Sequence, residues 1–235
     1  MNKWNKLAAL TAAAACVSVA SAESVFLDFE DVQDGSEVTI VGIGNVIAGH
    51  MRHGVYTDIG GTTQTGDFYS FCIELQNTDR SNISEYQIVN LTDAPDPDLS
   101  GSDTSYTQAQ ADAVVEAVAK AVQLDWITSN LQMGVDGNSD RMTAIQMAIW
   151  IALDFGDFNS IYTTSNFAAD LALSHLLFNT TVDANIETMM ADRLRAAVAD
   201  GEQDMLYVVP LPPAAWAGLG LLGVCAGVRQ ARRRG

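Results

Sequence analysis

The sequence predicts an α+β domain, with an antiparallel β-sheet or sandwich first and a helical subdomain after it. Residues 24–91 contain short runs of β-branched and aromatic residues separated by turn residues, which is typical of antiparallel strands. Residues 107–200 instead show apolar residues at helical spacing. A last apolar run at residues 204–209 predicts a final strand. Strands before helices, with no internal repeat, indicate one α+β domain.

The first 22 residues have the pattern of a secretory signal peptide. Lys3 and Lys6 precede an alanine-rich apolar stretch, and Ala20-Ser21-Ala22 forms an A-x-A-type cleavage site. We therefore expect export through the Sec pathway and removal of residues 1–22 by signal peptidase. A lipid anchor at Cys16 is the alternative.

Five strands are predicted before residue 92, separated by glycine- or aspartate-rich turns such as Asp34-Gly35-Ser36 and Gly60-Gly61. The predicted strands are residues 24–29, 37–42, 46–51, 68–75 and 86–91. A polar loop that contains several prolines and aspartates follows at residues 92–105.

Four helices are predicted after this loop. In the first, Val114, Val118 and Val122 recur at four-residue steps. The second contains Gln146 and begins with Ser139 or Asp140 as its N-cap. The first helix is predicted at residues 107–129, the third at residues 166–178 and the fourth at residues 183–199.

The C-terminal end, residues 210–235, carries a second targeting signal. The apolar stretch 211–228 is close to the shortest length that spans a membrane, about 17–25 residues, and four arginines follow it. Val209-Pro210-Leu211-Pro212 resembles the PEP-CTERM class of sorting signals in its Val-Pro-Leu-Pro variant, although Pro213 stands where Ala is usual. The resemblance implies processing by an exosortase in a Gram-negative envelope. A plain C-terminal membrane anchor is the alternative, and either one holds the domain outside the cytoplasm.

A single cysteine, Cys72, remains between the two targeting segments, so no disulfide can form within residues 23–209. An intermolecular disulfide, an inert buried thiol or a reactive group would each explain it. Alternation along the strand 68–75 puts Cys72 and Glu74 on the face opposite Phe71 and Ile73. The thiol is therefore expected outside the row that most plainly belongs to the core.

Gln146 interrupts the apolar stripe of the second predicted helix, four residues before Trp150. Burying a primary amide without partners costs about 1–3 kcal/mol. A hydrogen-bonded core glutamine is one explanation for its presence.

The two segments together resemble the thioester domains of bacterial surface adhesins. Phe71-Cys72-Ile73 matches the aromatic-Cys motif on a strand. Ile145-Gln146-Met147-Ala148-Ile149-Trp150 matches the hydrophobic-Gln-x-Ala-hydrophobic-Trp motif on a helix at every defined position. The resemblance implies an internal thioester between Cys72 and Gln146. It also implies autocatalytic, single-use chemistry without a cofactor, rather than enzymatic turnover.

Such a bond would capture an amine on a host, matrix or neighbouring-cell surface, for example a protein lysine or a polyamine. Phe71, Ile145, Ile149 and Trp150 would restrict the access of water to the bond. Glu74 is a candidate proton shuttle because it lies on the Cys72 face of the strand.

Residues 23–209 are strongly acidic. They contain all 29 acidic residues of the chain but six of its 12 basic residues, so their formal charge is six minus 29, or −23. Nucleic acid is not expected as a partner, because phosphate binding needs a basic surface. Lys120 is the one lysine of this part and is expected to face solvent. Lysine scarcity suits a reactive acyl donor, and an arginine-biased genome explains it equally well.

Two other functions remain open. One is a non-covalent structural protein of the cell surface or biofilm matrix, in which Cys72 is unreactive. The other is a cysteine hydrolase that pairs Cys72 with His50 or His53.

No metal site is expected. Asp136, Asn138 and Asp140 imitate the start of an EF-hand loop, but Arg141 and Met147 stand where Gly and Glu are needed. The three histidines (His50, His53 and His175) have no recognised zinc spacing and are expected at the surface.

Overall fold

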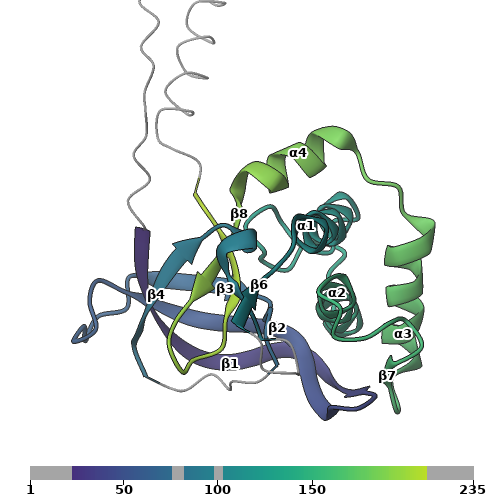
Figure 1. Ribbon diagram of the computed structural model, residues 1–235, viewed down its shortest axis with the longest axis horizontal. Coiled ribbons are helices and arrows are strands. Elements are labelled where there is room, and N and C mark those ends of the chain that lie inside the picture. The colour runs from purple at the N-terminus through teal and green to yellow at the C-terminus, as the bar shows by residue number, and fades with distance from the viewer. Residues whose placement is uncertain (1–22, 76–81, 98–102, 211–235) are drawn as a thin grey trace, which may run out of the picture.

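The computed structural model describes residues 23–75, 82–97 and 103–210. Within these residues, seven strands form one antiparallel sheet, and four α-helices lie together beside it (Figure 1). A small separate hairpin consists of β5 (Pro95–Pro97) and β6 (Asp103–Ser105). The predicted α+β class is therefore confirmed.

A long hairpin of β1 (Glu23–Ile40) and β2 (Gly44–Tyr56) forms the middle of the sheet. The predicted turn at residues 34–36 is wrong, because Gly35 lies inside β1 opposite Gly49. A Cβ on either glycine would lie 2.5 Å from a backbone oxygen of the facing strand. The two glycines therefore let the strands approach closely, and one strand replaces two predicted ones.

The sheet nearly closes on itself. The strand order is β3 (Gly66–Ser70), β2, β1, β4 (Ser84–Val89), β8 (Leu194–Val198) and β9 (Met205–Val208), with β7 (Ile161–Thr163) paired to the end of β1. The chain just beyond β3 then meets β9: the N–H of Leu206 donates to the Phe71 carbonyl at 2.9 Å, and the N–H of Ile73 donates to the Asp204 carbonyl at 3.0 Å. These bonds join the two outer strands, so the sheet approaches a barrel.

Residues 194–198 differ from the prediction, which placed them in a helix. Helix α4 (Ala184–Arg193) ends before them, and they form β8 between β4 and β9. Ala196 and Ala197 are completely buried there. Ladder hydrogen bonds and burial outweigh the helix propensity of alanine, which amounts to less than about 1 kcal/mol per residue. The final strand predicted at residues 204–209 is confirmed by β9.

The remaining helices begin close to where the sequence predicts. In α1 (Gln108–Gln123), Thr107 and Gln110 form a capping box. In α2 (Ser139–Ala152), the N-cap is Asn138, one residue before the predicted candidates. Helix α3 (Phe167–Ser174) continues into a π-helical segment, η2 (His175–Asn179), and a short 3₁₀ turn, η1 (Leu91–Asp93), precedes the β5–β6 hairpin.

Helix α2 is the centre of the molecule. It packs against α1 and α3 and against the β1–β2 hairpin (Figure 1). Every residue from Met142 to Trp150 is buried. The expected single apolar stripe is therefore wrong: the helix is enclosed on all sides, and Gln146 lies in the interior.

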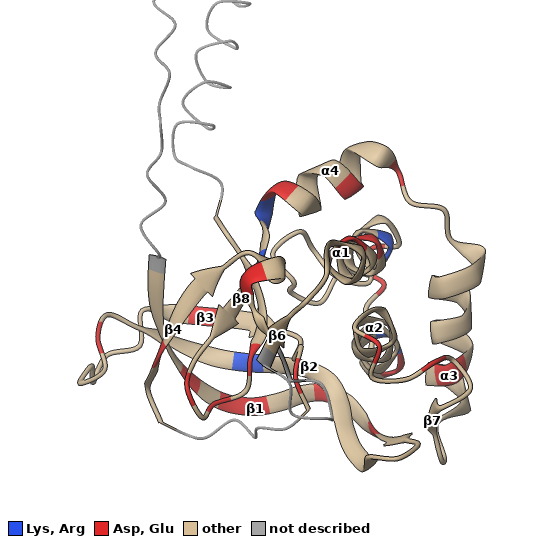
Figure 2. Cartoon of the chain, in the orientation of Figure 1, with Lys and Arg blue, Asp and Glu red and all other residues tan. Residues whose placement is uncertain are grey.

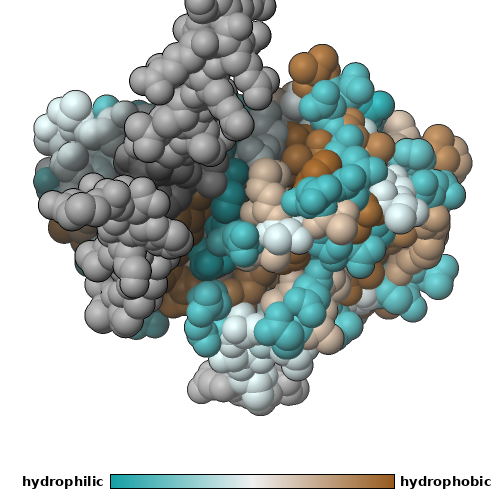
Figure 3. All heavy atoms as spheres, turned by 90° about the horizontal axis from the view of Figure 1, so that it is seen from above, coloured by the Kyte–Doolittle hydropathy of each residue, from teal (hydrophilic) through white to brown (hydrophobic). Residues whose placement is uncertain are grey.

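Acidic residues are spread over strands, loops and helices alike, whereas lysine and arginine are few among the described residues (Figure 2). From above, hydrophilic and hydrophobic residues alternate over the helical half (Figure 3). None of the described helices is long and apolar enough to cross a membrane. The predicted membrane helix, residues 211–228, and the predicted signal peptide, residues 1–22, lie outside the described residues.

Candidate functional site

Cys72 lies where β3 leaves the sheet and the chain crosses towards β9. It forms an isolated antiparallel bridge with Met205, and only 3% of its surface is exposed. The hydrogen bonds of its two neighbours to β9 hold its backbone on both sides. The cysteine is thus fixed between the sheet and helix α2.

Gln146 of α2 binds the backbone of Cys72 through both ends of its amide. Its oxygen Oε1 accepts from the Cys72 N–H at 2.9 Å, and its Nε2 donates to the Cys72 carbonyl at 2.7 Å. Gln146 is 1% exposed, so these two bonds satisfy an amide that burial would otherwise destabilise. The structure therefore brings together the two residues that the sequence motifs single out, 74 positions apart.

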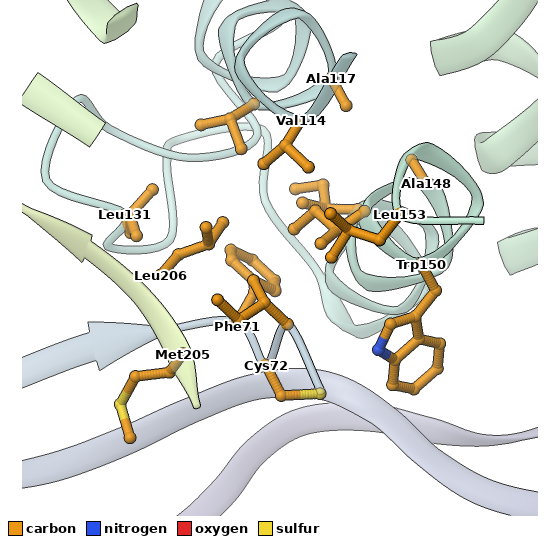
Figure 4. Close-up of a cluster of buried hydrophobic side chains, with 14 of the residues drawn as sticks. Phe71, Cys72, Val114, Ala117, Leu131, Ala148, Trp150, Leu153, Met205 and Leu206 are labelled. Carbon is orange, nitrogen blue, oxygen red and sulfur yellow. The ribbon is translucent and has the colours of Figure 1, made fainter. Parts of the chain in front are cut away.

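The Cys72 sulfur faces the indole of Trp150. In Figure 4 the indole nitrogen (blue) is turned towards the sulfur (yellow). The indole N–H has no oxygen or nitrogen acceptor and is completely buried. Burial raises the pKa of the Cys72 thiol to about 12. Hydrogen bonds from the Trp150 side chain and from the Glu74 backbone to the sulfur lower this pKa, but by less than burial raises it. At neutral pH the thiol is therefore protonated and resists attack by reagents that need a thiolate.

A cavity of about 370 Å³ opens beside this group, and Cys72, Gln146 and Trp150 all line it. Its other walls come mainly from apolar residues of β1 and β2, such as Phe29 and Met51. Asn45 and Gln203 supply polar groups, but apart from Cys72 no acidic, basic or other titratable side chain is among the described residues that line the cavity. A nucleophile that enters must therefore do so without help from a fixed base or counter-charge.

Phe71, Ile145 and Ile149, predicted as the shield around the bond, are buried but do not line this cavity. They lie in the core, where the ring of Phe71 packs against the ring of His50 with 5.2 Å between the ring centroids. Only Trp150 of the predicted pocket residues reaches the cavity. The strand residues that form its walls were missed, because the register of β1 against β2 depends on the Gly35–Gly49 approach.

Glu74, the candidate proton shuttle, is 3% exposed and turned towards β9. Its Oε2 accepts from the N–H of Asp204 at 3.1 Å, and its backbone carbonyl accepts from Gln203 Nε2 at 3.2 Å. The carboxylate does not line the cavity. Its negative charge contributes to the raised pKa of Cys72.

Asp204 was not predicted as part of the site. Burial, followed by the charge of Glu74, raises its pKa to about 7, and its Oδ1 accepts from the N–H of Ala199 at 3.1 Å. Two carboxyl groups therefore lie buried behind the Cys72 segment. No local signal could have revealed this pair, since its members meet only when β9 closes against residues 71–74.

The histidines predicted at the surface are instead buried in β2. The Nε2 of His50 lies 2.6 Å from the carbonyl of Leu131, and the Nε2 of His53 lies 2.9 Å from Ser70 Oγ. Burial lowers the pKa of both rings, that of His53 to about 3. Neither histidine lines the cavity with Cys72. Only His175, on η2, is exposed as expected.

Lys120 is also buried, which corrects the expectation that it faces solvent. It is 8% exposed, and its Nζ lies 2.8 Å from the carboxylate of Glu116 and 3.5 Å from the carbonyl of Leu177. It is the one lysine among the described residues. Its amine is therefore held inside its own domain.

Of the predicted sorting motif, Val209 and Pro210 are described, whereas Leu211 and Pro212 lie outside the described residues. Val209 exchanges hydrogen bonds with Arg193: its N–H donates to the Arg193 carbonyl at 3.0 Å, and its carbonyl accepts from the guanidinium at 3.2 Å. These bonds fasten the end of β9 to the end of α4.

Among the described residues, no group of three or more His, Cys, Asp or Glu side chains is placed to hold a metal ion. Comparisons with protein-family models, with curated proteins and with solved structures find no match for the chain.

Proposed function

We propose that this protein is an exported surface protein that forms an internal thioester between Cys72 and Gln146 and uses it to attach covalently to an amine. The observation that carries the proposal is the contact between the Gln146 amide and the Cys72 backbone at 2.9 and 2.7 Å, at a cavity that both residues line. This contact holds the Gln146 side chain against the residue that carries the thiol, and such positioning favours reaction between two groups.

In the first step the Cys72 sulfur attacks the side-chain carbonyl carbon of Gln146. The C–N bond of the amide breaks, the thiol proton passes to the nitrogen, and ammonia leaves. Negative charge develops on Oε1 during this step, and the Cys72 N–H already donates to that oxygen at 2.9 Å. A backbone donor so placed is the arrangement that stabilises tetrahedral intermediates of acyl transfer.

In the second step an incoming neutral amine attacks the thioester carbonyl. An amide forms on the Gln146 acyl group, the C–S bond breaks, and the thiol of Cys72 takes up the proton that the amine loses. A thioester is a better acyl donor than the amide it replaces, because a thiol leaves more readily than ammonia. The target is an amine-bearing surface molecule, either a protein lysine or a polyamine.

The burial of Lys120 supports this proposal. An acyl donor on a domain with exposed lysines would react with neighbouring copies of itself. Here the one described lysine is paired with Glu116 and covered by η2. The arginines of the domain cannot attack the thioester in place of a lysine, because a guanidinium stays protonated.

The proposed location is the cell envelope or extracellular matrix, reached through the signal peptide and held by the C-terminal sorting signal. Signal peptidase and an exosortase would process the two ends. Deleting residues 211–235 should release the folded domain from the envelope, and a truncated protein still bound to cells would show that anchoring resides elsewhere.

Intact-mass spectrometry of freshly purified mature protein tests the thioester directly. The expected mass is one ammonia below that of the sequence, and added methylamine should raise it by one methylamine while releasing one alkylatable thiol. A full sequence mass would contradict the thioester.

A non-covalent structural role is the second candidate. The observation in its favour is that the Gln146 amide is hydrogen-bonded at both its oxygen and its nitrogen, and that burial keeps the Cys72 thiol neutral. In that case the protein keeps its full sequence mass, and Cys72 reacts with alkylating reagents only after unfolding.

A further inference from the structure

We infer that Trp150 is a catalytic residue of the Cys72–Gln146 reaction, whose indole N–H donates a hydrogen bond to the Cys72 sulfur when that sulfur carries negative charge. This inference rests on the proposed function and assigns Trp150 a chemical part in it, beyond the shielding role expected from the sequence.

The first observation is a buried donor without a strong acceptor. Trp150 is 1% exposed, and its Nε1 has no oxygen or nitrogen acceptor. A buried indole N–H usually finds an acceptor, because leaving it unpaired is destabilising. A donor that faces only a neutral thiol in the resting protein fits an acceptor that becomes strong only during a reaction.

The second observation is where this donor points. Figure 4 shows the indole nitrogen turned towards the sulfur of Cys72, and the Trp150 side chain is the strongest influence that opposes the raised pKa of that thiol. A neutral thiol is a weak acceptor, whereas a thiolate is a strong one. The hydrogen bond is therefore weak in the ground state and strong when charge develops on sulfur, which is the condition for catalysis.

The third observation is that the two reacting atoms have separate donors. The Cys72 N–H serves the carbonyl oxygen of Gln146, while the Trp150 indole and the Glu74 backbone serve the sulfur. In thioester formation the sulfur loses its proton as it attacks. In aminolysis the C–S bond breaks, and the electron pair stays on sulfur until a proton arrives. Trp150 stabilises the same charged sulfur in both directions.

Removing the N–H while keeping a ring tests this inference. In Trp150→Phe, both the appearance of the ammonia deficit after refolding and the addition of methylamine should slow by about 10- to 100-fold, as expected for one hydrogen bond to a charged group. Trp126→Phe is the matched control, because Trp126 is also buried but lies against Arg141 and His175. Its rates should equal those of the unaltered protein.

The direction of the change separates a donor from a shield. If Trp150 only excludes water and amines, the smaller phenyl ring loosens the cavity, and methylamine addition and hydrolysis become faster. Faster or unchanged rates in Trp150→Phe therefore overturn the inference.

A shape-matched substitution covers the case in which Trp150→Phe fails to fold. Benzothienylalanine, incorporated at position 150 alone, replaces the N–H by sulfur and preserves the ring outline. Slowed formation and slowed methylamine addition in this variant support the inference, and rates within about twofold of the unaltered protein overturn it. Lack of the mass deficit in the unaltered protein is a different result, which overturns the thioester itself and the inference with it.

Discussion

Two buried polar clusters meet the chain only two residues apart, at Ser70 and at Cys72, yet they differ in what surrounds them. In the histidine cluster, His50 and His53 bond to a Leu131 carbonyl and to the Ser70 hydroxyl, and neither ring lines the cavity. In the cysteine cluster, Gln146 holds the Cys72 backbone, while the sulfur borders a cavity and faces N–H donors. Burial is therefore common to both clusters, and what distinguishes the cysteine cluster is the adjoining cavity and the N–H donors that face its sulfur.

The largest expected effect concerns the covalent bond itself. Cys72→Ala and Gln146→Ala should each abolish the ammonia deficit completely, because each removes one of the two bonded atoms. His53→Leu should retain the full deficit. Intact mass measured on all three proteins checks this contrast, and loss of the deficit in His53→Leu would show that the two clusters act as one.

The next effect concerns the mouth of the cavity. Ile47 lines the cavity and is 57% exposed, whereas Ile59 is 66% exposed and does not line it. Ile47→Lys should consume the thioester, by an internal amide or by dimers that survive boiling and reductant, because its amine is held beside the acyl group. Ile59→Lys should stay monomeric and keep its reactivity.

Methylamine uptake, thiol release and denaturing electrophoresis distinguish these two variants. Equal behaviour of both lysine proteins would mean that the cavity is not the route by which amines reach the bond.

The third expected effect concerns the contribution of the histidine cluster to folding stability. His53→Leu should lower the free energy of unfolding by about 1–3 kcal/mol, because it leaves the buried hydroxyl of Ser70 without its ring partner. Urea unfolding followed by circular dichroism measures this loss. An unchanged midpoint would show that the histidine cluster contributes little to stability.

The smallest effect is a pH dependence from Asp204. Its pKa is about 7 in the folded protein and near 3.8 when unfolded, so the folded state holds a proton that the unfolded state has lost between these values. Its stabilising contribution is complete below pH 4, declines as the pH rises to about 7, and is constant above that. The stability of the unaltered protein relative to that of Asp204→Asn should therefore fall as the pH rises over this interval.

Thermal unfolding from pH 4 to pH 8 measures the difference, with Asp200→Asn as the exposed control. A difference that does not vary with pH would contradict the raised pKa. His53 acts in the opposite sense: its pKa of about 3 means that stability is lost as the pH falls below about 6.5. Measuring Asp204→Asn against the unaltered protein cancels this histidine contribution.

The sequence singled out Cys72 and Gln146 through the resemblance of their two segments to the motifs of thioester domains, and the structure places the two residues in contact. It also predicted the α+β class and the starts of α1 and α2, since capping residues and periodicity act within a few positions. These features depend on neighbours along the chain, so they can be read without the fold.

The tertiary structure decided everything that depends on segments far apart in sequence. It merged two predicted strands into β1 through the Gly35–Gly49 approach, and it drew residues 194–198 from a helix into the sheet. It paired Glu74 with Asp204 and turned the Trp150 indole towards sulfur, because both contacts need β9 and α2 to close on residues 71–74. The physical reason is that strand register and packing depend on free energies summed over long-range contacts, which no local pattern encodes.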